Sequence, residues 1–316
     1  MDIGLMIEGQ DGLNWERWRR ILRAAEDLGF AHVFRSDHFT NPNPPDKDSL
    51  ELWTSLTFAA SETKRIQFGP LVSPVTFRHP SMVARVAAAV DDLSDGRLTL
   101  GLGAGWQERE HHNFGIPFPP TGVRYEMLVD YLEVVSRLFW SDDHVSYEGT
   151  HFSLDDAILL PRPKRKYGPP ILVGGNGEKR TLPLAAKYAT EWNGVFLTPQ
   201  RFREKSEILD GLLDKGGRPR DTVRRSLMLG TVFAPDESTL REKLEARGLA
   251  DVDEARQHGV VAGTPEMWVE QLGAYREAGV QRVMLQWLEV DNIEGIEIVA
   301  RDVMPAVGGA PSGKAP

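Results

Sequence analysis

The residues with the clearest capacity for chemistry lie in the string RSDHF, residues 35–39, where an apolar strand pattern gives way to Asp37 and His38. A histidine titrates near neutral pH and can act as a general acid or base, and a neighbouring carboxylate can orient it or raise its pKa. A loop histidine that only hydrogen-bonds to a nearby backbone group is the simpler alternative. The residues alone leave both interpretations open.

A second candidate region is LTLGLGAGWQEREHHNFG, residues 98–115, in which a strand pattern runs into three alternating glycines that end at Gly105. Glycines let the backbone approach a flat group closely, such as a planar tricyclic ring. Trp106 would then form a wall, and Glu108 or Glu110 would supply a polar contact. We therefore expect this stretch to line a ring-shaped ligand.

The same region contains two patterns that we interpret as non-functional. His111 and His112 are adjacent, so their side chains diverge, and a solvated surface is favoured over a metal site. The string GLGAG lacks the full Gly-x-Gly-x-x-Gly spacing of a dinucleotide-binding loop. We expect no metal ion and no Rossmann-type site here.

The third region, PPILVGGNGEKRT at residues 169–181, is an apolar strand followed by a loop and then a helix. The loop consists of Gly174, Gly175, Asn176 and Gly177. Free backbone N–H groups at a helix N-terminus, with Lys179 and Arg180 nearby, form a site for a cofactor phosphate. A tight strand-to-helix turn without a ligand is the alternative.

The fourth region, GPLVSPVTFRHP at residues 69–80, places Val72 and Ser73 at the end of a strand. Ser73 lies on the same predicted rim as His38 and is able to hydrogen-bond to a ring or a phosphate. Taken alone, this string indicates only a strand end and a turn before a helix that begins at Pro80.

The elements that must position these residues alternate between strand and helix. Asn14 is a predicted helix N-cap, and Gly29 is the matching C-terminal glycine. Strands are predicted at residues 3–7, 32–36, 66–71, 98–102, 171–173, 192–196, 226–232 and 281–286. Eight such alternations favour an α/β fold closed as a (β/α)8 TIM barrel, with an open doubly wound sheet as the alternative.

Three stretches exceed a minimal barrel and are interpreted as insertions in βα loops: residues 41–48, 144–166 and 249–263. The middle one contains a predicted hairpin around Gly149. We expect one barrel domain over residues 1–304 and a disordered tail over 305–316, because the tail is Pro/Gly-rich and without periodicity.

Composition narrows the class of protein further. The chain has 316 residues, a net charge of −9 and no cysteine. The negative charge argues against nucleic-acid binding, and the lack of cysteine excludes disulfides and thiolate metal sites. No apolar run approaches the roughly 18 to 20 residues of a membrane-spanning helix, so we expect no membrane partner and a cytoplasmic location.

Taken together, SDHF, VTFRHPSMVARVAAAVDDLSDGRLTLGLGAGW, and ILVGGNG followed by LAAKYATEWN resemble the luciferase-like monooxygenase superfamily, and most of all its coenzyme F420-dependent oxidoreductases. The resemblance implies a homodimer and a cofactor ring across the barrel mouth, with its phosphate near Gly174–Gly177. It also implies a non-proline cis peptide at Val72 and Ser73, a ring-edge contact for Asp37, and an acid or substrate-orienting role for His38.

The resemblance implies hydride transfer between F420 and a substrate. We expect a small, largely apolar substrate, because aromatic residues such as Phe39, Trp106 and Trp287 lie near predicted strand ends. Sugar-phosphate dehydrogenases of the superfamily carry an acidic residue where this chain has Trp106, so glucose 6-phosphate is not expected. The alternatives are an FMN-dependent monooxygenase served by a separate cofactor reductase, and a non-catalytic flavin-binding barrel.

Overall fold

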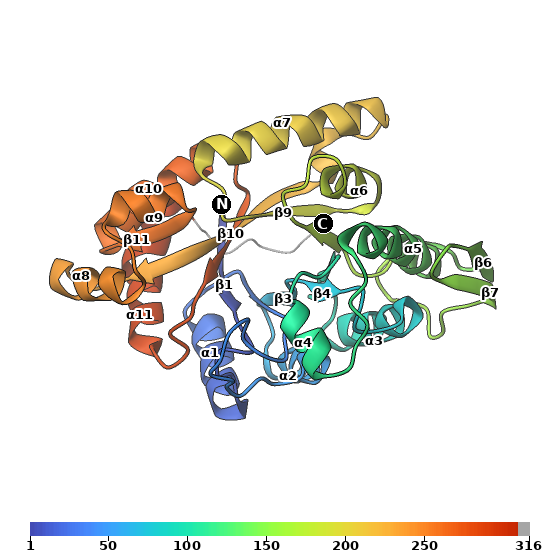
Figure 1. Ribbon diagram of the computed structural model, residues 1–316, viewed down its shortest axis with the longest axis horizontal. Coiled ribbons are helices and arrows are strands. Elements are labelled where there is room, and N and C mark those ends of the chain that lie inside the picture. Colours follow the sequence, from blue (N-terminus) through green and yellow to red (C-terminus); the bar gives the residue numbers. More distant parts are fainter. Residues whose placement is uncertain (309–316) are drawn as a thin grey trace.

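A computed structural model describes residues 1–308 and shows a parallel β-sheet closed into a barrel (Figure 1). The barrel strands are β1 Asp2–Ile7, β2 His32–Arg35, β3 Gln67–Pro70, β4 Ser73–Pro74, β5 Leu100–Gly103, β8 Ile171–Gly174, β9 Glu191–Val195, β10 Arg224–Phe233 and β12 Arg282–Gln286. Their order is β3-β2-β1-β12-β10-β9-β8-β5-β4, and a parallel bridge between Phe68 and Leu98 closes the ring. The strand β3 matches the third predicted strand, and the short β4 continues it after two residues, so the (β/α)8 prediction is confirmed.

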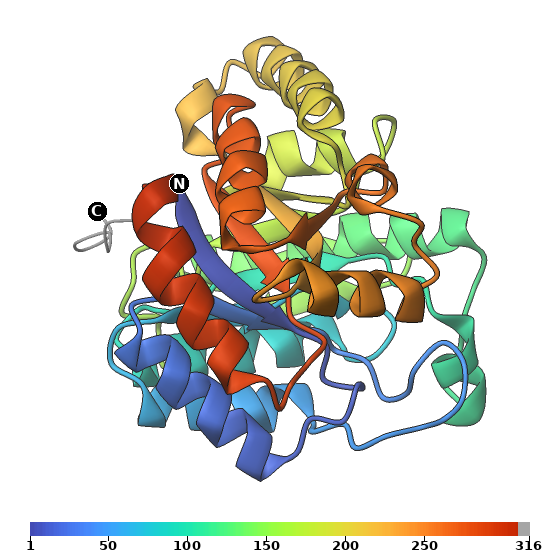
Figure 2. The ribbon, with the colours of Figure 1, turned by 90° about the vertical axis from the view of Figure 1, so that its left-hand side faces the viewer.

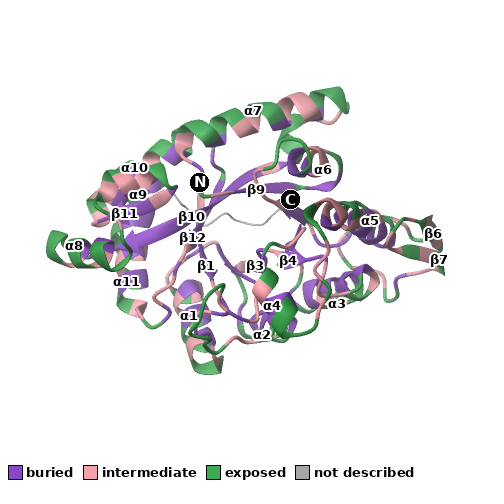
Figure 3. Cartoon of the chain, viewed as in Figure 1, coloured by how far each residue is buried: buried purple, intermediate pink, exposed green. Residues whose placement is uncertain are grey.

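Helices surround the barrel on its outer side (Figure 2). They are α1 Trp15–Asp27, α2 Leu52–Glu62, α3 Pro80–Leu93, α4 Glu108–Asn113, α5 Thr121–Trp140, α6 Thr181–Tyr188, α7 Pro199–Lys215, α8 Glu237–Ala246, α9 Val252–Gln257, α10 Pro265–Glu277, α11 Ile293–Ile298 and α12 Met304–Val307. In α1 the predicted signals hold: the Asn14 side chain accepts a hydrogen bond from Arg17 N at 3.0 Å, and Gly29 has a φ of +89°. Each helix turns a buried face inward and an exposed face outward (Figure 3).

Two layers of apolar side chains stabilise the barrel. The larger one lies between strands and helices and includes Trp18, Trp192 and Trp268, all fully buried. The smaller one fills the inside of the barrel. It consists of Met6, Phe34, Leu71, Leu172, Met228 and Met284, with Val72 and Val195 packed against it. Because burial of apolar surface drives folding, this interior plug helps to hold the strand ends in place.

Two of the three predicted insertions contain regular structure. The middle one forms the antiparallel hairpin β6 Val145–Glu148 and β7 Ser153–Ala157, as expected, and it projects to one side of the barrel (Figure 1). Residues 249–263 are more than a charged insertion, because they contain α9 and the strand β11 Val260–Gly263, which pairs with β10. The short apolar run Val261–Ala262 is buried and is preceded by charged residues, which obscure the strand signal.

Two further expectations need correction. The non-proline cis peptide joins Leu71 and Val72, one residue before the predicted position. Residues 305–307, the start of the expected tail, belong to α12, because Val307 is buried against the core; the rest of the expected tail, residues 309–316, lies outside the described residues. Within residues 1–308 no helix is long and apolar enough to cross a membrane.

Candidate functional site

The candidate site lies at the carboxyl ends of the barrel strands, where βα loops meet above the interior plug. Side chains two residues apart in a strand point to the same face. Met6, Phe34 and Met284 belong to the plug, and the positions two residues further on are Glu8, Ser36 and Gln286. These polar side chains therefore rise from an apolar floor at the mouth of the barrel.

His38 and Glu110 form a polar pair on this rim, across 72 residues of sequence. His38 Nδ1 lies 2.7 Å from Glu110 Oε1, and the backbone N–H of Phe39 donates to Glu110 Oε2 at 2.8 Å. Glu110 is 1% exposed, whereas the alternative candidate Glu108 is exposed. A carboxylate only accepts hydrogen bonds, so Nδ1 carries the hydrogen and Nε2 is left for a ligand.

The surroundings of His38 raise its pKa above the usual value of 6.5. Burial lowers this pKa, but the hydrogen bond and charge of Glu110 and the charges of Glu8 and Asp37 raise it by more. A larger share of imidazolium is thus present near neutral pH than for an isolated histidine. His38 is therefore suited to give a proton to a substrate oxygen and to take it back.

Asp37 belongs to a hydrogen-bonded network next to His38. Its carboxylate accepts hydrogen bonds from Ser73 Oγ at 2.9 Å and from both terminal nitrogens of Arg78. The carboxylate of Glu51 binds the same guanidinium at 2.8 Å. Asp37 is 2% exposed, so this buried network ties the end of β2 to β4. The predicted ring-edge contact of Asp37 stays a prediction.

Arg78 is the main residue of this network that sequence reasoning missed. Its sequence context indicates only a residue that precedes helix α3. The signal that could have found it is the pairing rule for buried carboxylates, since a buried Asp37 requires a cation or several donors. The bidentate geometry of a guanidinium meets that need.

Aromatic rings close the rim above His38. Trp106 is 63% exposed and meets the His38 ring edge-on, with 5.4 Å between the ring centroids. The neighbouring Gly105 has a φ of +77°, a backbone conformation that side chains with a Cβ rarely adopt. Phe39 stacks on Phe77 at 4.4 Å. These rings form an apolar wall on the β2–β5 side of the mouth.

Val72 occupies the place where three strands come closest. A Cβ added to Gly103 would lie 2.6 Å from Val72 Cγ2, and one added to Gly174 would lie 3.0 Å from Val72 Cγ1. The glycines on β5 and β8 thus make room for the Val72 side chain. The carboxyl ends of β4, β5 and β8 form a surface with few side chains above the plug.

The glycine loop after β8 is held to the next strand. Asn176 Nδ2 donates to Val195 O at 2.8 Å, and Val195 N donates to Asn176 Oδ1 at 3.0 Å. Gly175 has a φ of +125°, and Gly177 is exposed before helix α6, which no side chain caps. Gly175 N–H donates to Asn193 O at 2.9 Å, so the loop presents the backbone N–H groups of Asn176 and Gly177, next to the exposed Lys179 and Arg180. This is the geometry of an anion site.

The histidine pair behaves differently from the expectation of a solvated surface. His111 is 1% exposed, and its ring nitrogens contact Thr76 Oγ1 and Gln107 O, each at 2.7 Å. Only His112 is exposed. The buried position of His111 follows from its place on the inner face of α4, which also carries Glu110. Over the described part of the chain no group of three or more His, Cys, Asp or Glu side chains is arranged to hold a metal ion.

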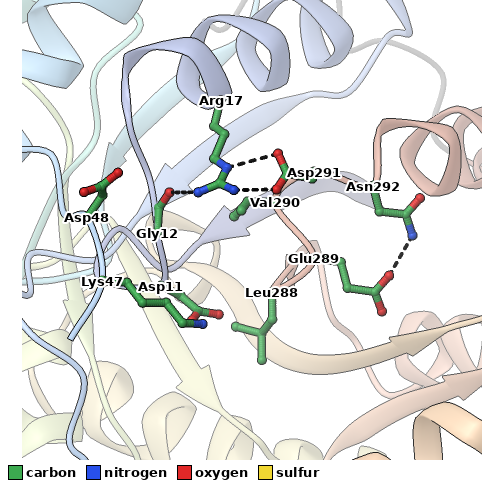
Figure 4. Close-up of a pocket in the computed structure, with 10 residues that line it drawn as sticks. All are labelled: Asp11, Gly12, Arg17, Lys47, Asp48, Leu288, Glu289, Val290, Asp291 and Asn292. Carbon is green, nitrogen blue, oxygen red and sulfur yellow. Dashed lines mark hydrogen bonds and ion pairs between the residues drawn. The ribbon is translucent and has the colours of Figure 1, made fainter. Parts of the chain in front are cut away.

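A polar cavity of about 560 Å³ lies on the opposite, β1–β12 side of the rim (Figure 4). It is lined by Asp11, Gly12, Arg17, Lys47, Asp48, Leu288, Glu289, Val290, Asp291 and Asn292. Its charged groups largely neutralise one another: Arg17 binds Asp291 at 2.6 Å, and Lys47 binds Asp11. We therefore place the candidate site at His38 and the glycine loop, which follow β2 and β8 at the carboxyl ends of the barrel strands, and not in this cavity.

Comparisons with known proteins identify relatives of this chain and structures with the same fold. The chain is 27% identical to the F420-dependent glucose-6-phosphate dehydrogenase of Microbacterium testaceum over 89% of this chain and 90% of that protein. It is 29% identical to a pyrimidine monooxygenase of Pseudomonas savastanoi pv. phaseolicola over 69% of this chain and 65% of that protein. The fold matches that of an F420-dependent secondary alcohol dehydrogenase, solved with an F420-acetone adduct, with a TM-score of 0.85 and 22% identity over 97% and 99% of the two chains.

The profile of one protein family covers most of the barrel. The profile described as luciferase-like monooxygenase matches residues 3–252, which include every predicted site residue. The chain belongs to the luciferase-like monooxygenase family.

Proposed function

We propose that this protein is an F420-dependent oxidoreductase that transfers a hydride between the deazaflavin and a small, largely apolar substrate. When bound, the deazaflavin accepts or gives the hydride, and the protein supplies binding, orientation and proton transfer. The proposal is supported by F420-dependent relatives along nearly the whole chain and by the way the residues of the mouth suit such a group.

The residues of the mouth fit a flat ring joined to a phosphate. The plug with Val72 and Val195 offers an apolar floor, and the glycines of β5 and β8 let the Val72 side chain pack into it. Gly105 and Trp106 border it on one side. On the other, the loop formed by Gly174, Gly175, Asn176 and Gly177 offers backbone N–H groups for a phosphate, with two exposed cations beside it. Asn176, anchored to Val195, keeps this loop in position.

His38 is the proposed catalytic residue. Its Nε2 takes or gives the substrate proton that accompanies the hydride, and Glu110 holds the ring in the tautomer that makes this possible. Ser73 and Asp37 support the rim beside it. The observation that carries the proposal is the buried Glu110 carboxylate on His38 Nδ1, because a histidine held only for structure does not need an oriented, free Nε2.

The substrate is proposed to be small and mainly apolar because the wall beside His38 is aromatic. Trp106 contacts the His38 ring edge-on, and Phe39 and Phe77 extend the same wall. This wall argues against a sugar phosphate. We further propose that the protein acts in the cytoplasm as a homodimer.

Binding titrations with F420 and with reduced FMN, followed by the fluorescence of each cofactor, test the proposal. We expect F420 to bind in preference, and His38→Ala to leave F420 affinity unchanged while it lowers turnover at least about a hundredfold, the range of general acid–base catalysis. Tight binding of FMN with no binding of F420 would favour an oxygen-using monooxygenase that requires a separate reductase. Turnover unaffected by His38→Ala would contradict the catalytic assignment.

A further inference from the structure

A second polar group stands at the mouth, across from His38, and the proposed proton transfer does not use it. Glu8 follows strand β1 and lies at the mouth, above Met6 of the plug. Its Oε1 accepts a hydrogen bond from Gln286 Nε2 at 2.7 Å, and its Oε2 accepts one from Gln10 Nε2 at 2.9 Å. Ser36 Oγ donates to Gln10 Oε1 at 2.7 Å and so fixes that amide.

Glu8 differs from the other carboxylates of the rim in having no cationic partner. Asp37 binds Arg78, and Glu110 binds His38. Within residues 1–308, no Lys, Arg or His side chain lies within ion-pair distance of Glu8; the amides of two glutamines hold it instead. Each oxygen receives one amide hydrogen, so each keeps acceptor capacity for a further donor.

The field of Glu8 reaches the reacting histidine. Its charge is among those that raise the pKa of His38, so Glu8 lies close enough to act on that ring. Glu8 is also only partly buried, unlike Gln10 and Ser36, which are 6% and 1% exposed. Gln10 and Ser36 are therefore packed behind the carboxylate, whereas Glu8 and Gln286 are partly exposed at the mouth.

We propose that Glu8 is a specificity-determining residue that accepts a hydrogen bond from a donor group of the substrate, a hydroxyl or an ammonium, at the β1–β12 side of the mouth. This inference rests on the proposed function. It refines the substrate class: an otherwise apolar molecule whose reacting carbon lies near His38 and which carries a hydrogen-bond donor on its far side.

The test compares two alcohols on the F420-loaded protein: cyclohexanol, and the cyclohexane diol with hydroxyls on opposite ring carbons. The wild-type protein should prefer the diol in kcat/KM. Glu8→Gln keeps the shape but loses the charge, and charge-assisted hydrogen bonds are about twice as strong as neutral ones, so the preference should fall about tenfold. Glu8→Asp should restore part of it. If neither alcohol is turned over, the same ratio is read from their dissociation constants, by the change in F420 fluorescence.

Two controls separate the possible outcomes. Glu289→Gln removes a carboxylate that lines the cavity of Figure 4 and binds Lys243, and it should leave the diol preference unchanged. F420 affinity should be the same in wild type and Glu8→Gln. A wild-type protein that binds neither alcohol or does not distinguish them, or an unchanged preference in Glu8→Gln, overturns the role of Glu8. Absence of F420 binding in the wild type refutes the proposed function instead.

Discussion

Replacing Glu110 by glutamine should change both the tautomer of His38 and the pH dependence of stability. Glu110 accepts from two donors, His38 Nδ1–H and Phe39 N–H, with one oxygen each. A glutamine has one oxygen, and the backbone N–H of Phe39 is a fixed donor. The NH2 group of the introduced glutamine would then face His38 Nδ1, which must become an acceptor. The imidazole would become neutral with its hydrogen on Nε2.

The sign of the pH effect follows from the pKa of His38. Because the folded protein raises this pKa above its usual value of 6.5, protonation of His38 stabilises the fold. This stabilisation is fully present below the unfolded pKa and is lost as pH rises through the folded pKa. A buried, charge-assisted hydrogen bond contributes about 1.5 to 3 kcal/mol. The difference in free energy of unfolding between wild type and Glu110→Gln should approach this value on the acidic side and shrink on the alkaline side.

Urea unfolding at a series of pH values between about 5.5 and 9 measures this difference, with the histidine signals followed by NMR in parallel. The His38 signal, assigned with His38→Ala, should titrate at lower pH in Glu110→Gln than in wild type. The exposed His112→Ala is the matched control and should leave the His38 titration unchanged. A stability difference that is the same at every pH, with an unshifted His38 titration, would refute the coupling of His38 to Glu110.

Three other predictions concern the rim. Arg78→Gln should lower the free energy of unfolding by about 3 to 5 kcal/mol, as measured by chemical denaturation, because the substitution leaves Asp37 buried without its cation. A loss below about 1 kcal/mol would contradict a stabilising ion pair between Arg78 and Asp37. Gly103→Ala should lower the free energy of unfolding by about 1 to 3 kcal/mol, because the added methyl group clashes with Val72. In a double-mutant cycle, Val72→Ala in the same chain should recover part of that loss. Additive losses would contradict the contact. Asn176→Ala removes both hydrogen bonds to Val195 and should weaken F420 binding about tenfold, as measured by titration. Binding of the deazaflavin ring without its phosphate should change little. Equal losses of affinity for both would contradict a phosphate role for this loop.

The strand and helix pattern was predictable because local sequence carries it. Alternating apolar residues, Asn14 as a cap and glycine at helix ends are all properties of short windows, and each predicted strand exists in the barrel. The strand β11 was not predicted. It is a short apolar run among charged residues, and its burial depends on pairing with β10. Such a strand is stabilised by tertiary contacts that no local window contains.

The composition of the rim was predictable, but its pairings were not. The strings around His38, Trp106 and Gly174 lie at the strand ends that their sequence patterns predict. The sequence offered Asp37 as the partner of His38, since the two are adjacent, whereas the fold brings in Glu110 and gives Asp37 to Arg78. Contacts between residues on different strand ends depend on how the barrel closes. Glu8 was missed for the same reason, because its glutamine partner Gln286 lies 278 residues away.

The most direct test of the central claim is a crystal structure of the protein with F420 bound. The deazaflavin ring should lie above the interior plug, beside Val72 and Trp106 and within hydrogen-bonding reach of the groups around His38. The phosphate should lie against the loop of residues 174–177. A cofactor bound in the cavity of Figure 4, or with its phosphate away from the glycine loop, would contradict it.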